Sequence, residues 1–289
     1  REKEKLLAVA NAQDKILTDL GGGAKDLVVR ILESSKEKMI VIHIYVDVRD
    51  AMGANAVNTM VEALAPVVEE ITGGYVRLKI LSNLADQRLV TARAVFDKEL
   101  IGGEKVVDSF LESVELAKID PYRAATHNKG IMNGMDAVII ATGNDFRAVE
   151  SGAHAYAARN GQYTSLTDYW KDETGNLVGE IKVPLALGTV GGAGSIHPTA
   201  QVCKKMMGVS SAHKLAEHVA SVGLAQNFAA VLALSTVGIQ KGHMSLHAKN
   251  IAMMAGADEN QIDEIAQVLI NEGKVNLQRA KELVERRKK

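Results

Sequence analysis

The chain has 289 residues, of which 47% are hydrophobic and 24% are charged. This composition is typical of a folded protein of about two domains, and it excludes a chain that is disordered throughout. Basic and acidic residues nearly balance at 34 and 35, so the net charge of −1 gives no general electrostatic reason to bind nucleic acid. The single cysteine, Cys203, excludes an internal disulfide and suits a reducing cytosol.

Neither the beginning of the chain nor its most apolar stretch favours a membrane protein. Residues 1–5 carry charges of both signs, and no apolar core with a cleavage site follows them, so they do not read as an export signal. Residues 219–240 lack charge, but seven serine, threonine, glycine and amide residues interrupt them. We therefore expect a buried central helix there, and a cytoplasmic protein without a membrane partner.

The first hundred residues predict a compact α+β unit. Apolar residues recur at helical spacing over 1–18 and 53–71, and each of these segments ends at a run of glycines. The predicted strands, which are rich in β-branched residues, are 27–32, 39–46, 76–81 and 89–96. The order of these elements favours a mostly antiparallel sheet.

Beyond residue 100 the pattern is more helical. The predicted helices are 103–118, 148–160 and 212–236, and 162–183 is expected to form a hairpin that turns at 172–175. Residues 137–142 fit a short strand or another buried segment. A tail of two polar-faced helices, separated by Gly273, is expected from Gly242 onward.

Residues 50–55, Asp-Ala-Met-Gly-Ala-Asn, lie between a predicted strand and a predicted helix. Small residues let a ligand approach the backbone, and a helix N-terminus favours an anion. The alternative is structural: Asp50 would cap the following helix in a tight turn. The glycine spacing is not that of the Rossmann dinucleotide motif, so that fold is not predicted.

The densest polar cluster is 120–130, which includes Arg123, His127, Asn128 and Lys129. An arginine can bind a carboxylate through two parallel hydrogen bonds, and a lysine can place its charge on a developing oxyanion. A solvated loop with a helix cap explains the same residues equally well.

Asp145 follows a buried apolar run in the sequence Ala-Thr-Gly-Asn-Asp. A turn at such a place often carries a functional carboxylate, although a cap for the helix that starts near Arg147 is the simpler interpretation. Asn227 lies inside the apolar central helix, where an amide needs a partner.

His243 and His247 are four residues apart, on one face of a predicted helix. This spacing can bind zinc, but no glutamate follows the first histidine and no third ligand is near. We therefore predict no metal site, and an acid–base histidine is the more plausible functional alternative.

Seven segments taken together resemble 3-hydroxy-3-methylglutaryl-coenzyme A (HMG-CoA) reductase of the soluble prokaryotic class. They span nearly the whole chain: 47–55, 81–86, 120–134, 141–155, 188–192, 223–227 and 238–250. Thr-His-Asn-Lys-Gly, Ala-Thr-Gly-Asn-Asp and Gly-His-Met carry the resemblance as a set, because each is far less specific alone.

The resemblance implies an α+β fold of two domains and a flap. Residues 1–84 would form a ferredoxin-like cofactor-binding domain, 85–237 a larger substrate domain with a central buried helix, and 238–289 a mobile C-terminal helical segment. It also implies two hydride transfers from a nicotinamide cofactor, which reduce HMG-CoA through mevaldehyde to mevalonate and release CoA. The family forms homodimers whose active sites draw on both subunits, and a higher oligomer stays open.

By the same resemblance, Lys129 matches the catalytic lysine and Asp145 the aspartate that pairs with it. His243 matches the histidine that protonates the departing CoA thiolate, and His247 is given no catalytic role. The residues matched to substrate binding are Arg123, Asn133 and Asn227. The residues matched to cofactor binding are Asp14, Asp50, Met52, Gly53 and Asn83.

Asp14 lies where the resemblance places the residue that faces the adenosine ribose. A carboxylate there accepts hydrogen bonds from the 2′-hydroxyl and repels a 2′-phosphate, so NADH is expected in preference to NADPH. As alternatives, Asp14 is a solvated helix residue, or Lys15 or Lys25 reaches a phosphate.

One family feature is missing from the sequence, namely the catalytic glutamate in a segment that reads roughly Glu-Asn-Val-Ile-Gly. The chain as written is therefore expected to lack the N-terminal part of the substrate domain, which is truncated or is a separate chain. The rival hypothesis is a catalytically silent module that binds cofactor or CoA and acts with a partner.

Overall fold

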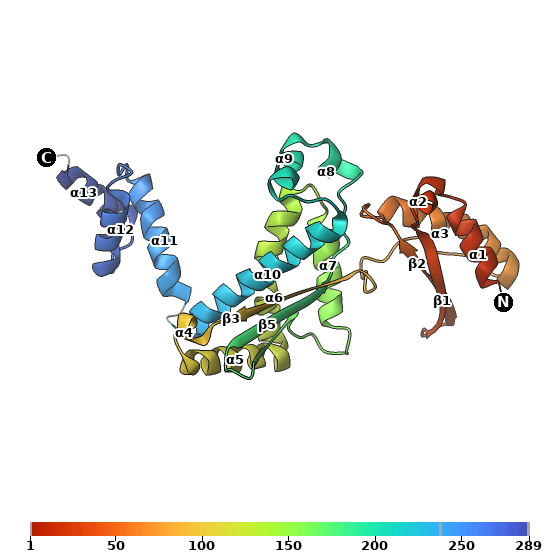
Figure 1. The fold of residues 1–289 in the computed structure, drawn as a ribbon, viewed down its shortest axis with the longest axis horizontal. Coiled ribbons are helices and arrows are strands. Elements are labelled where there is room, and N and C mark those ends of the chain that lie inside the picture. Colours follow the sequence, from red (N-terminus) through yellow and green to blue (C-terminus); the bar gives the residue numbers. More distant parts are fainter. Residues whose placement is uncertain (1, 237–238, 288–289) are drawn as a thin grey trace. The chain divides into compact units, whose positions relative to one another are not determined.

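The computed structural model describes residues 2–236 and 239–287, and the side chains of 239–246 and 287 lie outside this description. Helices and strands are both present, which confirms the mixed α and β class (Figure 1). The chain divides by its internal packing into two units. The first is Arg1–Val95, Ala117–Tyr169 and Val178–Gln226, and the second is Phe96–Leu116, Trp170–Leu177 and Asn227–Lys289. The domain limits 1–84, 85–237 and 238–289 stay a prediction.

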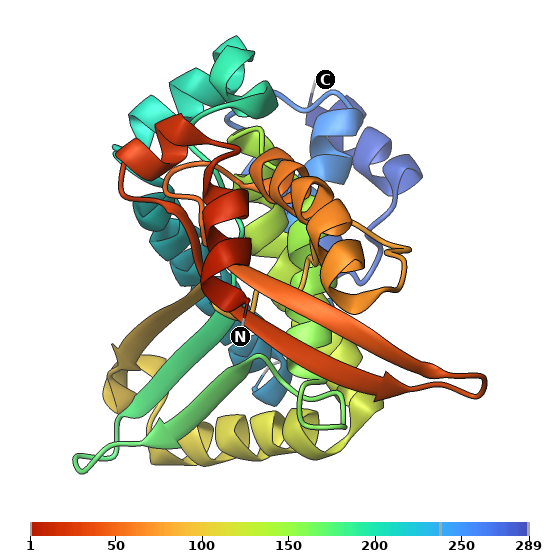
Figure 2. The same cartoon turned by 90° about the vertical axis from the view of Figure 1, so that its right-hand side faces the viewer.

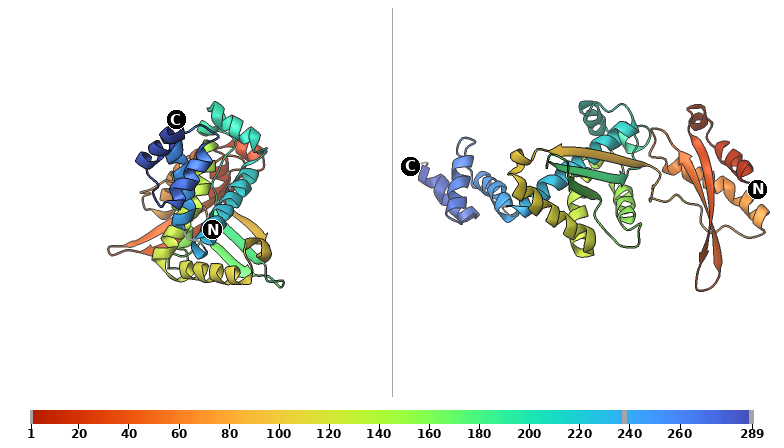
Figure 3. Two further views of the ribbon diagram at one scale, coloured as in Figure 1. Left: turned by 90° about the vertical axis from the view of Figure 1, so that its left-hand side faces the viewer. Right: turned by 60° about the horizontal axis from the view of Figure 1, so that its bottom comes forward.

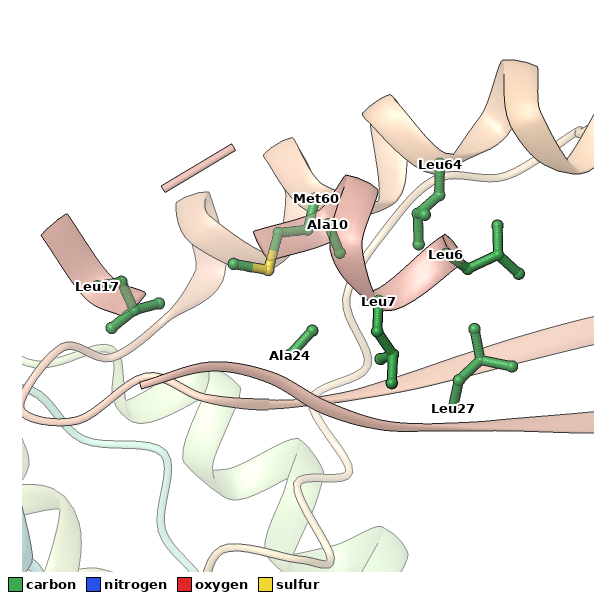
Figure 4. Close-up of a cluster of buried hydrophobic side chains, with 8 residues drawn as sticks. All are labelled: Leu6, Leu7, Ala10, Leu17, Ala24, Leu27, Met60 and Leu64. Carbon is green, nitrogen blue, oxygen red and sulfur yellow. The ribbon is translucent and has the colours of Figure 1, made fainter. Parts of the chain in front are cut away.

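The first unit begins with a helix-covered β-hairpin. Its elements are α1 (Lys3–Asn11), α2 (Lys15–Asp19), β1 (Gly23–Glu33), β2 (Lys38–Asp47) and α3 (Ala54–Thr72). β1 and β2 pair in antiparallel register, with Leu27 opposite Ile44, and the long hairpin is seen in Figure 2. α1 and α3 pack against it around a core of buried side chains (Figure 4). These are Leu6, Leu7, Ala10, Leu17, Ala24, Leu27, Met60 and Leu64.

Two predictions for this region are wrong. The helix expected over 1–18 is interrupted, because the Asp14 carboxylate accepts the backbone N–H of Leu17 at 2.9 Å and starts a second helix. Residues 76–81 form no strand. The backbone N–H of Val76 donates to the Glu69 side chain at 2.7 Å and that of Leu81 to Asn58 at 2.9 Å, so α3 satisfies them in place of a strand.

A second sheet has three strands in the order β3-β5-β4. They are β3 (Leu89–Phe96), β4 (Thr167–Lys171) and β5 (Leu177–Pro184). The predicted strand over 89–96 and the predicted hairpin are confirmed, but β3 joins this sheet rather than the one near the N-terminus. The first sheet therefore has two strands, fewer than the four of a ferredoxin-like fold.

Three helices carry or adjoin the predicted residues Lys129, Asp145 and Asn227. They are α6 (Pro121–Ala141), α7 (Phe146–Ala157) and α10 (Ala212–Ser235). α6 continues through 137–141, so the strand alternative for this apolar run is wrong. α6 and α10 approach closely, since a Cβ on Gly223 would lie 2.8 Å from the Met135 side chain. The first unit, which includes α10 up to Gln226, also contains α8 (Gly192–Ile196) and α9 (Pro198–Met206).

α10 is the helix in the described part of the chain that is long and apolar enough to cross a membrane. About a third of its most apolar window, 33%, is buried inside the protein. Its buried positions recur every three or four residues, as at Leu215, Val219 and Leu224. The expected burial of this helix therefore holds for one face.

The second unit contains α4 (Lys98–Ile101), most of α5 (Glu104–Ile119), and a C-terminal cluster of three helices. The three are α11 (Ile239–Met254), α12 (Ile262–Asn271) and α13 (Leu277–Arg287), around Ile265, Leu269 and Val284. Two tail helices were expected. The third arises because Gly256, at φ +84°, ends α11 in addition to the predicted break at Gly273.

Candidate active site

The loop between β2 and α3 contains the first group of predicted site residues. α3 begins at Gly53, whose φ of +104° is left-handed and whose position offers no side-chain cap. Asp50 does not cap α3, so that structural alternative is wrong. Its carboxylate instead accepts the backbone N–H of Ala212 at 2.7 Å, at the start of α10. Its carbonyl oxygen accepts the N–H of Thr189 at 2.8 Å.

Arg88 fixes this loop from the other side. Its guanidinium donates to the carbonyl oxygens of Ala51 at 3.1 Å, Met52 at 3.2 Å and Leu187 at 2.6 Å. Burial lowers the pKa of Arg88, although it stays charged at neutral pH. Sequence analysis did not identify Arg88. The one weak signal was an arginine directly before a predicted strand.

Glycine allows the two segments held by Arg88 to touch. A Cβ on Gly188 would lie 2.5 Å from the backbone nitrogen of Met52. Residues 187–190 and the 48–53 loop therefore form one rigid backbone surface beside the N-terminus of α3.

An open depression of about 350 Å³ lies next to this surface, within the first unit. Its lining residues are Met52, Ala54, Leu81, Asn83, Asp145, Arg147 and Ala148. The structure thus brings two predicted cofactor residues, Met52 and Asn83, together with the predicted catalytic residue Asp145. Gly152 of α7 makes this possible, because a Cβ there would lie only 2.3 Å from the Asn83 carbonyl oxygen.

Asp145 is the N-cap of α7, as the structural interpretation predicted. Its Oδ1 atom accepts the backbone N–H groups of Arg147 at 3.0 Å and Ala148 at 3.2 Å, and pairs with the Arg147 side chain at 3.4 Å. Burial raises the pKa of Asp145, but the hydrogen bonds from Ala148 and Arg147 outweigh it and lower that pKa below its ordinary value. The group is a carboxylate at neutral pH.

The polar cluster at 120–130 is helix and not loop. Asp120 caps α6 by accepting the N–H of Arg123 at 3.0 Å. His127 and Asn128 are buried: the His127 ring bonds Thr167 at 2.7 Å, and Asn128 donates to the Thr164 carbonyl at 2.8 Å. Burial lowers the pKa of His127 to about 3, so it is neutral and structural.

Lys129 and Asn133, four residues apart, are exposed on one face of α6, and Arg123 is half-buried. Twelve residues of helix separate Lys129 from the end of α6 at Ala141, which is about 18 Å at 1.5 Å per residue. Asp145 lies beyond that end. Within one chain, the structure therefore separates Lys129 from Asp145 and from the depression.

The remaining predicted residues lie elsewhere. Asn227 is 2% exposed within α10, while the side chain of His243 lies outside the described residues. Asp14 caps α2, as described above. Among the residues that the structure describes, no three His, Cys, Asp or Glu side chains are grouped so that they could hold a metal ion.

Residues 1–248 match the family model of hydroxymethylglutaryl-coenzyme A reductase. The chain belongs to this family. It is 53% identical to the 3-hydroxy-3-methylglutaryl-coenzyme A reductase of Archaeoglobus fulgidus over 286 residues, and 39% identical over 247 residues to a probable HMG-CoA reductase of Borreliella burgdorferi. The alignments cover 99% and 82% of this chain, but only 65% and 56% of the two relatives.

The fold is similar to that of a solved family member. A class II HMG-CoA reductase of Streptococcus pneumoniae, bound to NADPH in open conformations, superposes with a TM-score of 0.80 at 42% identity. The match covers 100% of this chain and 71% of that structure. The resemblance found in the motifs is therefore confirmed as membership of the family.

Proposed function

We propose that the protein of which this chain is part reduces HMG-CoA to mevalonate and free CoA, with four electrons from NADH or NADPH, in the mevalonate pathway. The observation that carries this proposal is the depression in which Met52, Asn83 and Asp145 meet, in a chain of the HMG-CoA reductase family. The lone cysteine, Cys203, suits a reducing compartment and supports a cytoplasmic location.

The depression suits a nicotinamide cofactor. Its wall combines small and apolar side chains with the Asn83 amide, and the N-terminus of α3 at Gly53 offers backbone N–H groups to an anion. Met52, Gly53 and Asn83 would hold the cofactor, which supplies hydride when bound. Asp50 would act through the loop, because its carboxylate already caps α10. The NADPH-bound pneumococcal relative supports this class of cofactor.

The exposed face of α6 would bind the substrate. Arg123 would grip the terminal carboxylate of HMG-CoA, and the Lys129 ammonium would stabilise the oxygen of the carbonyl that is reduced. Asn133 and Asn227 would complete the polar contacts. His243 would protonate the departing CoA thiolate, and the C-terminal segment that carries it would close over the site.

We further propose a homodimer in which Lys129 of one subunit meets Asp145 of the other. The distance of about 18 Å along α6 supports this arrangement, since a lysine side chain cannot span it within one chain. Each active site would then combine the cofactor side of one subunit with the substrate side of its partner.

The test uses the full-length protein and follows HMG-CoA-dependent oxidation of NADH and NADPH, together with release of CoA. The variant Lys129→Ala should lose turnover by about a hundredfold to a thousandfold, because one oxyanion contact typically contributes that much. It should fold normally, as Lys129 is exposed.

The matched control is Lys105→Ala, which removes an exposed lysine from another helix, α5. It should keep wild-type turnover. Full activity of Lys129→Ala would remove this residue from the mechanism. A wild-type protein that binds the cofactor but never oxidises it with HMG-CoA would instead support the silent binding module.

A further inference from the structure

Residues 187–190, which we call the scaffold segment, contact the loop that carries residues matched to cofactor binding. We call that loop, residues 48–53, the cofactor loop. The backbone N–H groups of Thr189 and Val190 donate to the carbonyl oxygen of Asp50 at 2.8 Å and 3.3 Å, and the two segments also form an isolated parallel bridge. These bonds join backbone to backbone, so they fix where one segment lies against the other.

The scaffold segment also contacts the turn between α6 and α7, which presents Asp145. The N–H of Gly188 donates to the Asn144 side chain at 2.8 Å, one residue before Asp145. Just beyond the scaffold segment, α8 touches the same turn, because a Cβ on Gly143 would lie only 2.5 Å from the Cα of Gly194. The scaffold segment therefore joins the cofactor loop to the turn that carries the predicted catalytic aspartate.

Arg88 bonds both segments with a single guanidinium group. Its Nη2 atom donates to the carbonyl oxygen of Leu187 at 2.6 Å. Its Nη1 atom donates to those of Ala51 at 3.1 Å and Met52 at 3.2 Å. The Arg88 carbonyl accepts the N–H of Leu185 at 3.0 Å, which anchors the residue itself directly after β5. A guanidinium can make these bonds together because its N–H groups form a rigid fork, which a lysine ammonium lacks.

The cofactor loop contains a strained residue, which such bonds hold in place. Arg49 has a φ of +51°, in the left-handed region that residues with a side chain rarely adopt. The Asp47 carboxylate accepts the N–H of Arg49 at 2.9 Å, and Nη2 of Arg88 donates to its carbonyl oxygen at 3.4 Å. Loss of Arg88 would therefore free the loop to leave this conformation.

We propose that the scaffold segment keeps the cofactor loop and Asp145 in register, and that Arg88 and Asn144 are the positioning residues that hold it. Neither is among the residues that line the depression, so Arg88 acts through the loop and Asn144 through the turn. The inference rests on the proposed function, in which Asp145 and the cofactor serve one substrate. Register matters there because a misplacement of about 1 Å can cost about a hundredfold in rate.

The experiment compares the full-length wild-type protein with Arg88→Ala, Asn144→Ala and the double variant. Affinity for NADPH is measured without substrate, from the fluorescence of the bound cofactor. Arg88→Ala should weaken this affinity about tenfold, as a loop that holds its binding conformation only about a tenth of the time would do. Asn144→Ala should keep the affinity and lower kcat, by about tenfold to a hundredfold, because it moves Asp145 and not the cofactor.

Free guanidinium ion, at a concentration too low to unfold the protein, should restore the NADPH affinity of Arg88→Ala, whereas ammonium ion should not. If Arg88→Ala does not fold, Arg88→Lys replaces it, and its affinity should also fall because one ammonium cannot bond all of these carbonyls. The free energies of unfolding of the four proteins form a double-mutant cycle. Because both side chains bond the same short segment, the double variant should lose less stability than the sum of the single losses.

The controls remove similar bonds elsewhere. Arg159→Ala removes an arginine that donates to the Tyr156 carbonyl at 2.8 Å, and Asn176→Ala removes an asparagine that accepts the N–H of Lys98 at 3.1 Å. Both should bind NADPH and turn over as the wild type does.

Two results would overturn the inference. Additive losses of stability would show that Arg88 and Asn144 do not share one scaffold. Wild-type NADPH affinity in the Arg88 variants would show that Arg88 does not position the loop. A wild type that bound NADPH but did not reduce HMG-CoA would instead count against the proposed function alone, since affinity and unfolding are both measured without substrate.

Discussion

At the level of single residues, several helices of this chain begin at an aspartate that acts as the N-cap. Asp14, Asp120 and Asp145 each accept backbone N–H groups in the first turn of the helix that follows. Asp14 and Asp145 are themselves matched to cofactor binding and to catalysis, and Asp120 lies three residues before Arg123. Asp50, which is also matched to cofactor binding, accepts the first N–H of α10 in a similar way. A substitution by alanine at such a site therefore mixes two effects, because it removes both a charge and a helix cap.

Asp14 allows these two effects to be separated. Asparagine caps a helix as well as aspartate does, so Asp14→Asn should leave stability nearly unchanged, whereas Asp14→Ala should cost about 1 kcal/mol. If the carboxylate selects against the 2′-phosphate, wild type should prefer NADH, and Asp14→Asn should reduce the ratio of kcat/KM for NADH over NADPH. A wild-type preference for NADPH would contradict this prediction. If the ratio of kcat/KM for NADH over NADPH were the same in Asp14→Asn as in the wild type, Asp14 would act only as the N-cap of α2.

Local contacts were the part of the site that the sequence could predict. The caps at Asp145 and near Asp120 follow from residue types within a few positions of a helix start. The bonds of Asp50 to Ala212 and of Arg88 to Leu187 join residues 162 and 99 positions apart. No local pattern indicates which distant backbone group a polar side chain will meet, so these roles required the structure.

At the level of secondary structure elements, periodicity predicted helices well and strands less well. α3 and α10 were found because apolar residues repeat every three or four positions over many turns. Residues 76–81 have the composition of a strand, but their backbone groups bond to side chains of α3. Strand formation depends on a partner strand, which composition alone does not reveal. β1 and β2 continue as a hairpin beyond α1 and α3 (Figure 3). Ile31 and Ile40, which pair with each other in this hairpin, are exposed.

A substitution at Gly152 tests whether the close approach of α7 to Asn83 shapes the depression. Its backbone touches the Asn83 carbonyl, and a Cβ at 2.3 Å cannot be accommodated without moving one of them. Gly152→Ala should therefore destabilise the fold by about 1–3 kcal/mol, typical of overpacking, and should raise KM for the cofactor more than it lowers kcat. Chemical denaturation and steady-state kinetics measure the two effects.

Gly74→Ala is a suitable control for Gly152→Ala. The nearest atom to a Cβ at residue 74 is 3.5 Å away, an ordinary contact, and the position has no left-handed backbone. We expect little change in stability or in KM. Equal behaviour of the two variants would show that the contact between α7 and Asn83 does not shape the depression.

At the level of the whole molecule, the sequence motifs predicted the family, and the spacing of two motif residues bears on how the active site is assembled. The three most specific motifs contain Lys129, Asp145 and His243, which the resemblance matches to one active site. The structure places Lys129 within α6, twelve residues before its end at Ala141, and Asp145 beyond that end. The twelve residues of α6 that follow Lys129 rise about 18 Å, which is too far for the Lys129 side chain to reach Asp145 of the same chain.

The proposed sharing of active sites predicts complementation between two inactive variants. Lys129→Ala and Asp145→Asn, which keeps a capping side chain at the start of α7, should each abolish turnover in the full-length protein. When the two are unfolded together, mixed in equal amounts and refolded, half of the dimers are heterodimers. If each site takes Lys129 and Asp145 from different subunits, one of the two sites in a heterodimer is intact, and the mixture should recover about a quarter of wild-type activity. Each variant refolded alone is the control. If both residues came from the same subunit, every site would lack one of them, and the mixture would stay inactive.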